Sequence, residues 1–130
     1  MSKQSPIQQL ESYRWRNRLI LLFFPETSHP AYLKQLEQLE GYENDLEARD
    51  VSVLHFQQTR KEARLTLPES DAQQLRQHFD IDPDTFTFVL VGKDGTVKRR
   101  AEHPVSLTDL LAQIDTMPMR QAEMRQAEHD

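Results

Sequence analysis

The chain has no cysteine among its 130 residues. That absence excludes disulfide bonds, thiolate nucleophiles, CxxC redox pairs and cysteine-ligated zinc from its chemistry. Glycine is scarce, with three residues, and Gly92-Lys93 is followed by Asp94 where a phosphate-binding loop needs serine or threonine. Long apolar runs are missing too. The longest, residues 19–24, is far too short to span a bilayer.

The formal net charge is −5, which disfavours nonspecific binding to nucleic acid or to an anionic membrane. Residues 13–18 interleave arginine with tyrosine and tryptophan, a pattern found in nucleic-acid patches. We prefer a structural interpretation, with Trp15 packed on the core, because one short cluster on an acidic chain is a poor electrostatic footprint. The first 18 residues contain neither an apolar core nor a small-residue cleavage site, which predicts no signal peptide and a cytoplasmic location.

The stretch from residue 85 to residue 100 predicts a β-hairpin. Residues 86–91 are almost all aromatic or β-branched, as in a strand covered on both faces. Asp94-Gly95 predicts a type I′ turn, and Gly92 is a candidate bulge or close packing contact. The second arm, residues 96–100, becomes charged, which suits the edge of a sheet.

Two more strands and a helix precede the hairpin. Residues 19–24 predict a buried strand and residues 51–56 a third strand. Between them, residues 31–48 place leucines at helical spacing, with Gly41 as a weak point and Thr27 or Ser28 as the cap. A strand, a helix and a strand in this order predict two parallel strands.

Capping-box patterns predict two later helices, beginning at Ser70 and Ser106, and a short extended piece is expected at residues 63–67. The pentapeptide MRQAE then occurs twice after Pro118, so we expect a partly helical tail over residues 119–130. Its apolar content includes Met117, Met119 and Met124, and two copies are too few for a repeat fold. Residues 1–11 are expected to form a flexible arm and residues 12–118 a single domain.

The order of elements predicts an α/β, thioredoxin-like fold. We expect a four-stranded mixed sheet in which residues 19–24 lie between 51–56 and 86–92, with 96–100 at one edge. Helices cover both faces. If residues 19–24 and 86–91 are not neighbours, this interpretation is wrong.

Three segments resemble one known family: RWRNRLILLFFP, DPDTFTFVLVGKDGTVKRR and IDTMPMRQAEM. They look like the domain of unknown function 4174, a peroxiredoxin-like domain of small bacterial proteins and of sushi-repeat-containing and coiled-coil-domain extracellular proteins. The resemblance covers about residues 12–125. It implies a thioredoxin-like fold and little about activity.

Two departures separate the chain from redox proteins of this fold. Their reactive cysteine lies at a helix N-terminus after the first central strand, where this chain has residues 25–32 and no thiol. Their cis-proline precedes the hairpin, where this chain has residues 84–87, with Pro83 earlier. Thiol peroxidase and disulfide oxidoreductase mechanisms therefore lose their reagent, and we expect no catalytic residue and no cofactor.

If the chain binds a ligand, the fold favours the carboxyl end of the first central strand, next to a helix N-terminus that attracts anions. The candidate binding residues there are Glu26, Thr27, Ser28, His29, Tyr32, Thr85 and Thr87. The alternative is that Thr27 or Ser28 caps the helix, His29 is solvated and Tyr32 packs on the sheet. No metal site is expected, because the five histidines are scattered without an HExxH or i, i+4 pair.

Two functional hypotheses stay open. The first is a non-catalytic protein-binding or scaffold module, with the hairpin edge or the methionine-containing tail as its surface. The second is a small-molecule binder, or an enzyme that needs no cysteine, working from the loop at residues 25–32. We prefer the first, with a protein as the partner and neither nucleic acid nor a membrane, because the missing chemistry is the firmer observation.

Overall fold

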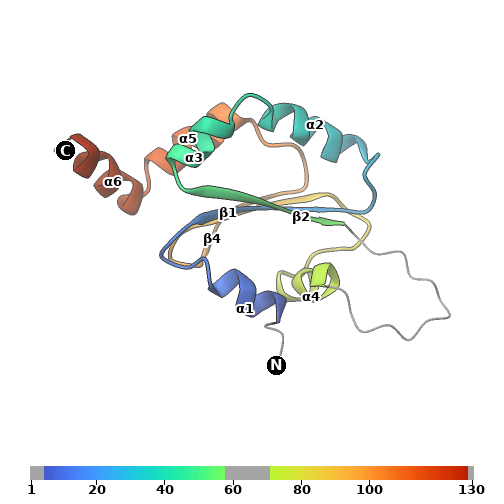
Figure 1. Cartoon of the computed structure of the whole chain (residues 1–130). Helices are drawn as coiled ribbons and strands as arrows, with labels where there is room; N and C mark the ends of the chain where they lie inside the picture. The colour runs from blue at the N-terminus through green and yellow to red at the C-terminus, as the bar shows by residue number, and fades with distance from the viewer. Residues whose placement is uncertain (1–4, 58–70, 129–130) are drawn as a thin grey trace.

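The computed structural model describes residues 5–57 and 71–128, and a four-stranded mixed sheet forms its middle layer (Figure 1). The central strand β1 (Arg18–Phe24) is buried at all seven positions. It pairs in parallel with β2 (Val51–Gln57) and antiparallel with β3 (Thr87–Val91), which pairs antiparallel with β4 (Val97–Ala101). The expected neighbours, residues 19–24 and 86–91, are therefore confirmed.

Helices cover both faces of this sheet (Figure 1). On one face lie α2 (Pro30–Leu39), α3 (Glu43–Ala48) and α5 (Leu107–Asp115); on the other lie α1 (Pro6–Glu11) and α4 (Asp71–His78). Alternate side chains of β1 enter the two apolar cores, as a strand's period of two requires. None of the helices in the described ranges is long and apolar enough to cross a membrane.

The helices differ from expectation mainly at their ends. The long helix over residues 31–48 is interrupted at Gly41, whose φ of 87° takes the chain out of the helical conformation between α2 and α3. Its cap is His29, without a side-chain hydrogen bond, so the assignment of Thr27 or Ser28 as the cap is wrong. Ser106 is at the N-cap of α5 but does not bond the backbone, because its hydroxyl pairs with that of Thr108.

The N-terminal segment is helical where a loose arm was expected, and two further expectations concern residues 63–70, which the structure does not describe. The extended piece at residues 63–67 and the cap at Ser70 lie outside the described residues. Residues 6–11, expected in a loose arm, form helix α1 instead. There the Ser5 hydroxyl and the Gln8 side chain make a reciprocal capping box, with Pro6 at the first helical turn.

The hairpin turn is real but is not of type I′. Gly95 has a φ of 82°, whereas Asp94 does not have a positive φ. The Gly95 N–H donates to the Gly92 carbonyl at 3.0 Å and the Gly92 N–H to the Thr96 carbonyl at 2.9 Å, which makes a three-residue loop ending in a left-handed glycine. The Asp94 carboxylate favours it by accepting from the Thr96 N–H. A Cβ on Gly92 would lie 2.6 Å from Lys98 Cε, so Gly92 is a close packing contact.

The aromatic and basic segment before β1 is arranged opposite to expectation. Trp15 is 60% exposed and has a φ of 69°, with the Arg14 guanidinium 5.4 Å from its ring. The buried member of the segment is Arg18, which is 1% exposed. A buried cation requires partners, and these come from the C-terminal helix.

Helix α6 (Pro118–Glu128) has no buried residue and is held by ion pairs. Glu123 accepts two hydrogen bonds from the Arg18 guanidinium, at 3.1 and 3.0 Å, and one from Lys93 Nζ at 2.9 Å. Burial by itself would raise the pKa of the Glu123 carboxyl, but the bonds from Arg18 and Lys93 outweigh it and lower that pKa. The tail is therefore a helix that ends at Glu128 and is anchored to the domain by Glu123.

Replacing Glu123 tests this anchor. Glu123→Ala leaves Arg18 buried without its carboxylate, so we expect the free energy of unfolding in urea to fall by about 3 kcal/mol. Glu128→Ala is the matched control, because Glu128 lies on the same helix and is exposed; its effect should stay within about 0.5 kcal/mol. Equal effects of the two substitutions would show that α6 is not anchored through Glu123.

Candidate functional site

The loop between β1 and α2 lies at the carboxyl end of the central strand, as expected for residues 25–32. Glu26, Thr27 and Ser28 are exposed there. Their side chains make no hydrogen bond with a described residue. In the backbone of the loop, the His29 N–H donates to the Glu26 carbonyl at 3.1 Å. These three side chains are available to solvent and are not organised around a common point.

His29 and Tyr32 turn away from the loop surface. The His29 ring is nearly parallel to that of Phe86, with centroids 6.4 Å apart, and its Nδ1 is buried without a partner in the described chain. The Tyr32 ring stacks on Phe24 at 3.7 Å, and its hydroxyl lies 3.0 Å from Nδ1 of His55 on β2. The packing expected of Tyr32 is present, and His55 is a partner that the sequence did not suggest.

The Tyr32–His55 pair is a neutral link between α2 and β2. Burial raises the pKa of the Tyr32 hydroxyl above 10.0 and lowers the pKa of the His55 imidazole below 6.5, although His55 as a whole is an exposed residue. Both groups are therefore uncharged near neutral pH. A neutral phenol is a weak nucleophile, and within residues 5–57 and 71–128 Tyr32 is the hydrogen-bond partner of the imidazole, with no third group that orients it as a base.

Thr85 and Thr87 flank Phe86, whose ring lies against that of His29, so their segment borders the loop. Thr87 is 1% exposed within β3, opposite Phe23 of β1. Thr85 is half-buried, and its N–H donates to the Asp82 carbonyl at 3.2 Å. Among the described residues, no hydrogen bond joins the seven candidate side chains to one another, and within residues 5–57 and 71–128 no cluster of three or more His, Asp or Glu side chains is placed to hold a metal ion.

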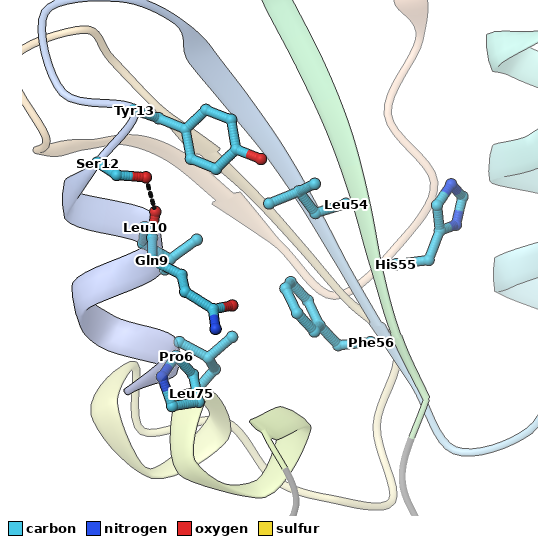
Figure 2. Close-up of a pocket in the computed structure, with 9 residues that line it drawn as sticks. All are labelled: Pro6, Gln9, Leu10, Ser12, Tyr13, Leu54, His55, Phe56 and Leu75. Carbon is cyan, nitrogen blue, oxygen red and sulfur yellow. Dashed lines mark hydrogen bonds between the residues drawn. The ribbon is translucent and has the colours of Figure 1, made fainter. Parts of the chain in front are cut away.

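The hollows of the surface lie elsewhere, along strand β2. On the α1 side, a cavity of about 320 Å³ opens between α1, α4 and the edge of the sheet (Figure 2). We call it the α1 pocket. Leu54 and Phe56 project into it from β2, while the His55 ring points to the opposite face of the strand (Figure 2). Its other walls are Pro6, Gln9, Leu10, Ser12, Tyr13 and Leu75.

On the opposite face of β2 lies a second hollow, of about 660 Å³, between the strand and helices α2 and α3. Its floor is apolar and its rim carries three glutamates, so we call it the acidic groove. The apolar residues are Leu33, Leu36, Leu39, Leu46 and Val53, and the rim residues are Glu37, Glu40 and Glu43. Leu33 is 46% exposed, which leaves this apolar surface open to solvent.

The α1 pocket and the acidic groove meet at the outer edge of β2. His55 borders both hollows. In the described part of the chain, β1 is the strand that pairs with β2, and the order β2-β1-β3-β4 leaves the other side of β2 without a neighbour. An edge of this kind presents unpaired backbone N–H and C=O groups. The edge and its two flanking hollows form one continuous site, which we call the β2 edge site.

The opposite edge of the sheet is a poor counterpart. Strand β4 carries Lys98, Arg99 and Arg100, and charged side chains protect an edge from unwanted pairing. These cations are also engaged: Lys98 with Asp94 at 2.9 Å, Arg99 with Gln113 at 3.2 Å and Arg100 with the carbonyl of Asp80 at 2.8 Å. The hairpin edge, proposed from the sequence as a strand acceptor, is therefore the edge that carries protective charged side chains.

The tail methionines line a third hollow, of about 560 Å³, beside the start of β1. Met117, Pro118 and Met119 form one wall and the exposed Trp15 another. Met119 is 37% exposed, but Met117 also packs against the core, which fixes this surface in place. Exposed Trp15 and Met119 make it a second candidate contact area, without an unpaired strand to bind backbone.

The sequence predicted β2 as a strand on the outer side of 19–24, as the structure has it, but did not single out its edge as a binding surface. Its residues VSVLHFQ contain no lysine, arginine or proline, the residues that natural edges use for protection. A comparison of the charged residues in β2 and β4 would have indicated that β2 is the less protected of the two outer strands. The acidic groove, by contrast, depends on the break at Gly41 and on how α2 and α3 pack.

The Tyr32–His55 link predicts how stability changes with pH. Because the pKa of folded His55 is lowered, the unfolded chain binds this proton more readily, and stability is lost as pH falls below 6.5. Urea unfolding of the His55→Gln variant should therefore change less than that of the unmodified chain between about pH 7 and pH 5. Identical pH profiles for the two proteins would contradict a lowered pKa at His55.

Comparison with solved structures supports a thioredoxin-like fold. A reduced 2-Cys peroxiredoxin of Plasmodium vivax superposes with a TM-score of 0.65 and 17% sequence identity, covering 87% of this chain and 84% of the other. StoA of Bacillus subtilis superposes with a TM-score of 0.55 and 18% identity, covering 75% and 81%. At these identities the likeness concerns the fold alone.

Sequence comparison adds the family. The chain is 31% identical over 133 residues to coiled-coil domain-containing protein 80 of Danio rerio, covering 88% of this chain and 15% of that protein. The chain therefore spans only a small part of this curated relative. The family model described as domain of unknown function (DUF4174) matches residues 9–123, nearly the whole chain. With its cysteine-free thioredoxin-like sheet, the chain belongs to this family.

Proposed function

We propose that the chain is a non-catalytic protein-binding module that accepts an extended segment of a partner protein at the β2 edge site. The observation that carries the proposal is that β2 has one edge without a partner strand among the described residues, with a hollow of apolar floor on each of its two faces. In strand addition, backbone hydrogen bonds supply affinity, and pockets for alternate side chains supply specificity. The β2 edge site offers both.

The lack of a thiol and of hydrogen bonds among the described candidate side chains supports the non-catalytic part of the proposal. Redox proteins of this fold act through a thiol, and this chain has none. The loop that would hold it presents three exposed side chains, while His29 and Tyr32 are packed inward. General acid–base or nucleophilic chemistry requires groups that converge within hydrogen-bond reach of a substrate.

One observation favours a small-molecule function as the second candidate. The buried Nδ1 of His29 has no partner in the described chain, and a polar atom in that state is usually satisfied by a ligand or water. A thermal-shift screen of metabolites tests it. Stabilisation that saturates with ligand concentration and is lost in His29→Phe, while persisting in Ser12→Ala, would support binding at the loop.

Site-specific cross-linking tests the proposed function in the cells that produce the protein. A photo-reactive residue is placed at Gln57 on β2 or, as the matched control, at the exposed Val97 on β4. We expect discrete intermolecular adducts from position 57 only. Val53→Pro should abolish them, because proline removes one backbone donor yet is tolerated on edge strands.

Val53→Lys is the second variant, since it keeps the N–H but places a protective lysine on the edge and, in the acidic groove, opposes a basic side chain of a partner. Far-ultraviolet circular dichroism and urea unfolding establish that both variants are folded. Adducts that form equally from Val97, or that survive both substitutions at Val53, would contradict binding at the β2 edge site.

A further inference from the structure

The two hollows beside β2 differ in chemistry, and this difference specifies the partner. We infer that the β2 edge site binds an extended segment in which bulky apolar residues alternate with lysine or arginine. The inference rests on the proposed function, because it presupposes that a strand is added to β2. Successive side chains of any added strand point to opposite faces of the sheet, so each face reads every second residue.

The α1 pocket selects apolar side chains. Its walls include Leu10, Tyr13, Leu54, Phe56 and Leu75, and none of its lining residues is an acid, a lysine or an arginine. Figure 2 shows Leu54 and Phe56 facing helix α1 across the opening. A charged side chain entering here would lose its hydration without gaining a partner, which is costly. Every second residue of the bound segment is therefore apolar.

The acidic groove selects long cationic side chains. Its leucine floor suits the aliphatic stem of lysine or arginine, and Glu37, Glu40 and Glu43 on its rim suit the charged end. None of these three carboxylates forms an ion pair with a described residue, so no cation of the described chain compensates their charge. Acidic side chains at these positions would be repelled. The intervening residues of the segment are therefore basic.

The shape of the site favours an extended partner over a helix. A helix presents one apolar stripe to one groove, whereas the α1 pocket and the acidic groove open on opposite faces of β2 and share His55 as a border. A helix laid in either hollow would leave the other empty and the edge backbone unpaired. An extended segment about as long as β2 fills both hollows and pairs the edge.

Charge also argues against a second copy of the chain paired through β2. The strand VSVLHFQ contains no lysine or arginine, so in an edge-to-edge dimer the paired strand itself would bring no cation to Glu37, Glu40 or Glu43. It would also bring two acidic rims together, on a chain whose net charge is −5. Like charges placed opposite each other oppose association.

Synthetic peptides test the inference on the full chain. The probe is fluorescein-labelled Val-Lys-Val-Arg-Leu-Lys-Val. One control has the same composition with apolar and basic residues in separate blocks, and another has glutamate at every basic position. Measured by fluorescence anisotropy, the alternating peptide should bind at least about tenfold more tightly than either control, because only it matches both faces. In NMR spectra of the protein, the backbone amide chemical shifts that change on adding this peptide should be centred on residues 51–57.

A charge-neutralised variant tests the rim. Replacing Glu37, Glu40 and Glu43 together by glutamine should weaken binding of the alternating peptide about tenfold, the sum of three exposed ion pairs. The matched control removes the same charge elsewhere, through Glu102→Gln, Asp109→Asn and Glu128→Gln, all at exposed positions. It should bind the peptide like the unmodified chain. Equal weakening in both variants would reduce the effect to net charge and overturn the role of the rim.

The outcomes separate the inference from the proposed function. If the block or acidic peptide binds as tightly as the alternating one, the inferred partner pattern is wrong. If no peptide binds but cross-linking from Gln57 is still abolished by Val53→Pro, the protein-binding function stands and the partner class is overturned. If the chain sediments as a dimer that Val53→Pro dissociates, the occupant is a second copy. If neither peptides nor Gln57 report binding at β2, both proposals fail.

Discussion

The fold depends on the complete burial of strand β1. Seven consecutive residues cannot be withdrawn from water unless both faces and both edges of the strand are covered. The two helical layers cover its faces, while β2 and β3 satisfy its backbone. Its first residue is an arginine, so the requirement extends to electrostatics, and α6 supplies the carboxylate that makes a buried Arg18 tolerable.

Burying β1 leaves β2 only partly covered, and this asymmetry separates the core from the candidate site. Strand β3 is buried at every position, whereas from Ser52 onwards β2 is half-buried or exposed. The same apolar composition that makes VSVLHFQ a strand leaves it without lysine, arginine or proline on an edge that no described strand covers. The chain thus keeps the sheet of a fold associated with thiol chemistry, and its candidate binding surface lies along the β2 edge of that sheet.

Sequence patterns predicted the elements that depend on local composition. The buried strands, the parallel pair, the hairpin and the weak point at Gly41 follow from runs of apolar residues and from glycine. The missed features depend on tertiary contacts. Trp15 is exposed while Arg18 is buried. His29, not Thr27 or Ser28, is the N-cap of α2, and Ser106 is the predicted N-cap of α5 but makes no side-chain bond to the backbone. The loop at residues 25–32 follows the central strand as expected, while the inward packing of His29 and Tyr32 depends on contacts with Phe86 and Phe24 that the sequence pattern does not show.

The twice-written pentapeptide MRQAE acquires a meaning from the anchored helix. In the first copy Arg120 pairs with Asp115 and Glu123 with Arg18, while Arg125 and Glu128 of the second copy are exposed. Deleting residues 119–123 would bring the second copy directly behind Pro118 and set an identical arginine and glutamate in the vacated positions. The second pentapeptide therefore supplies another arginine and glutamate that can form the same ion pairs with Asp115 and Arg18. Loss of one pentapeptide would shorten α6 and leave it anchored to the domain.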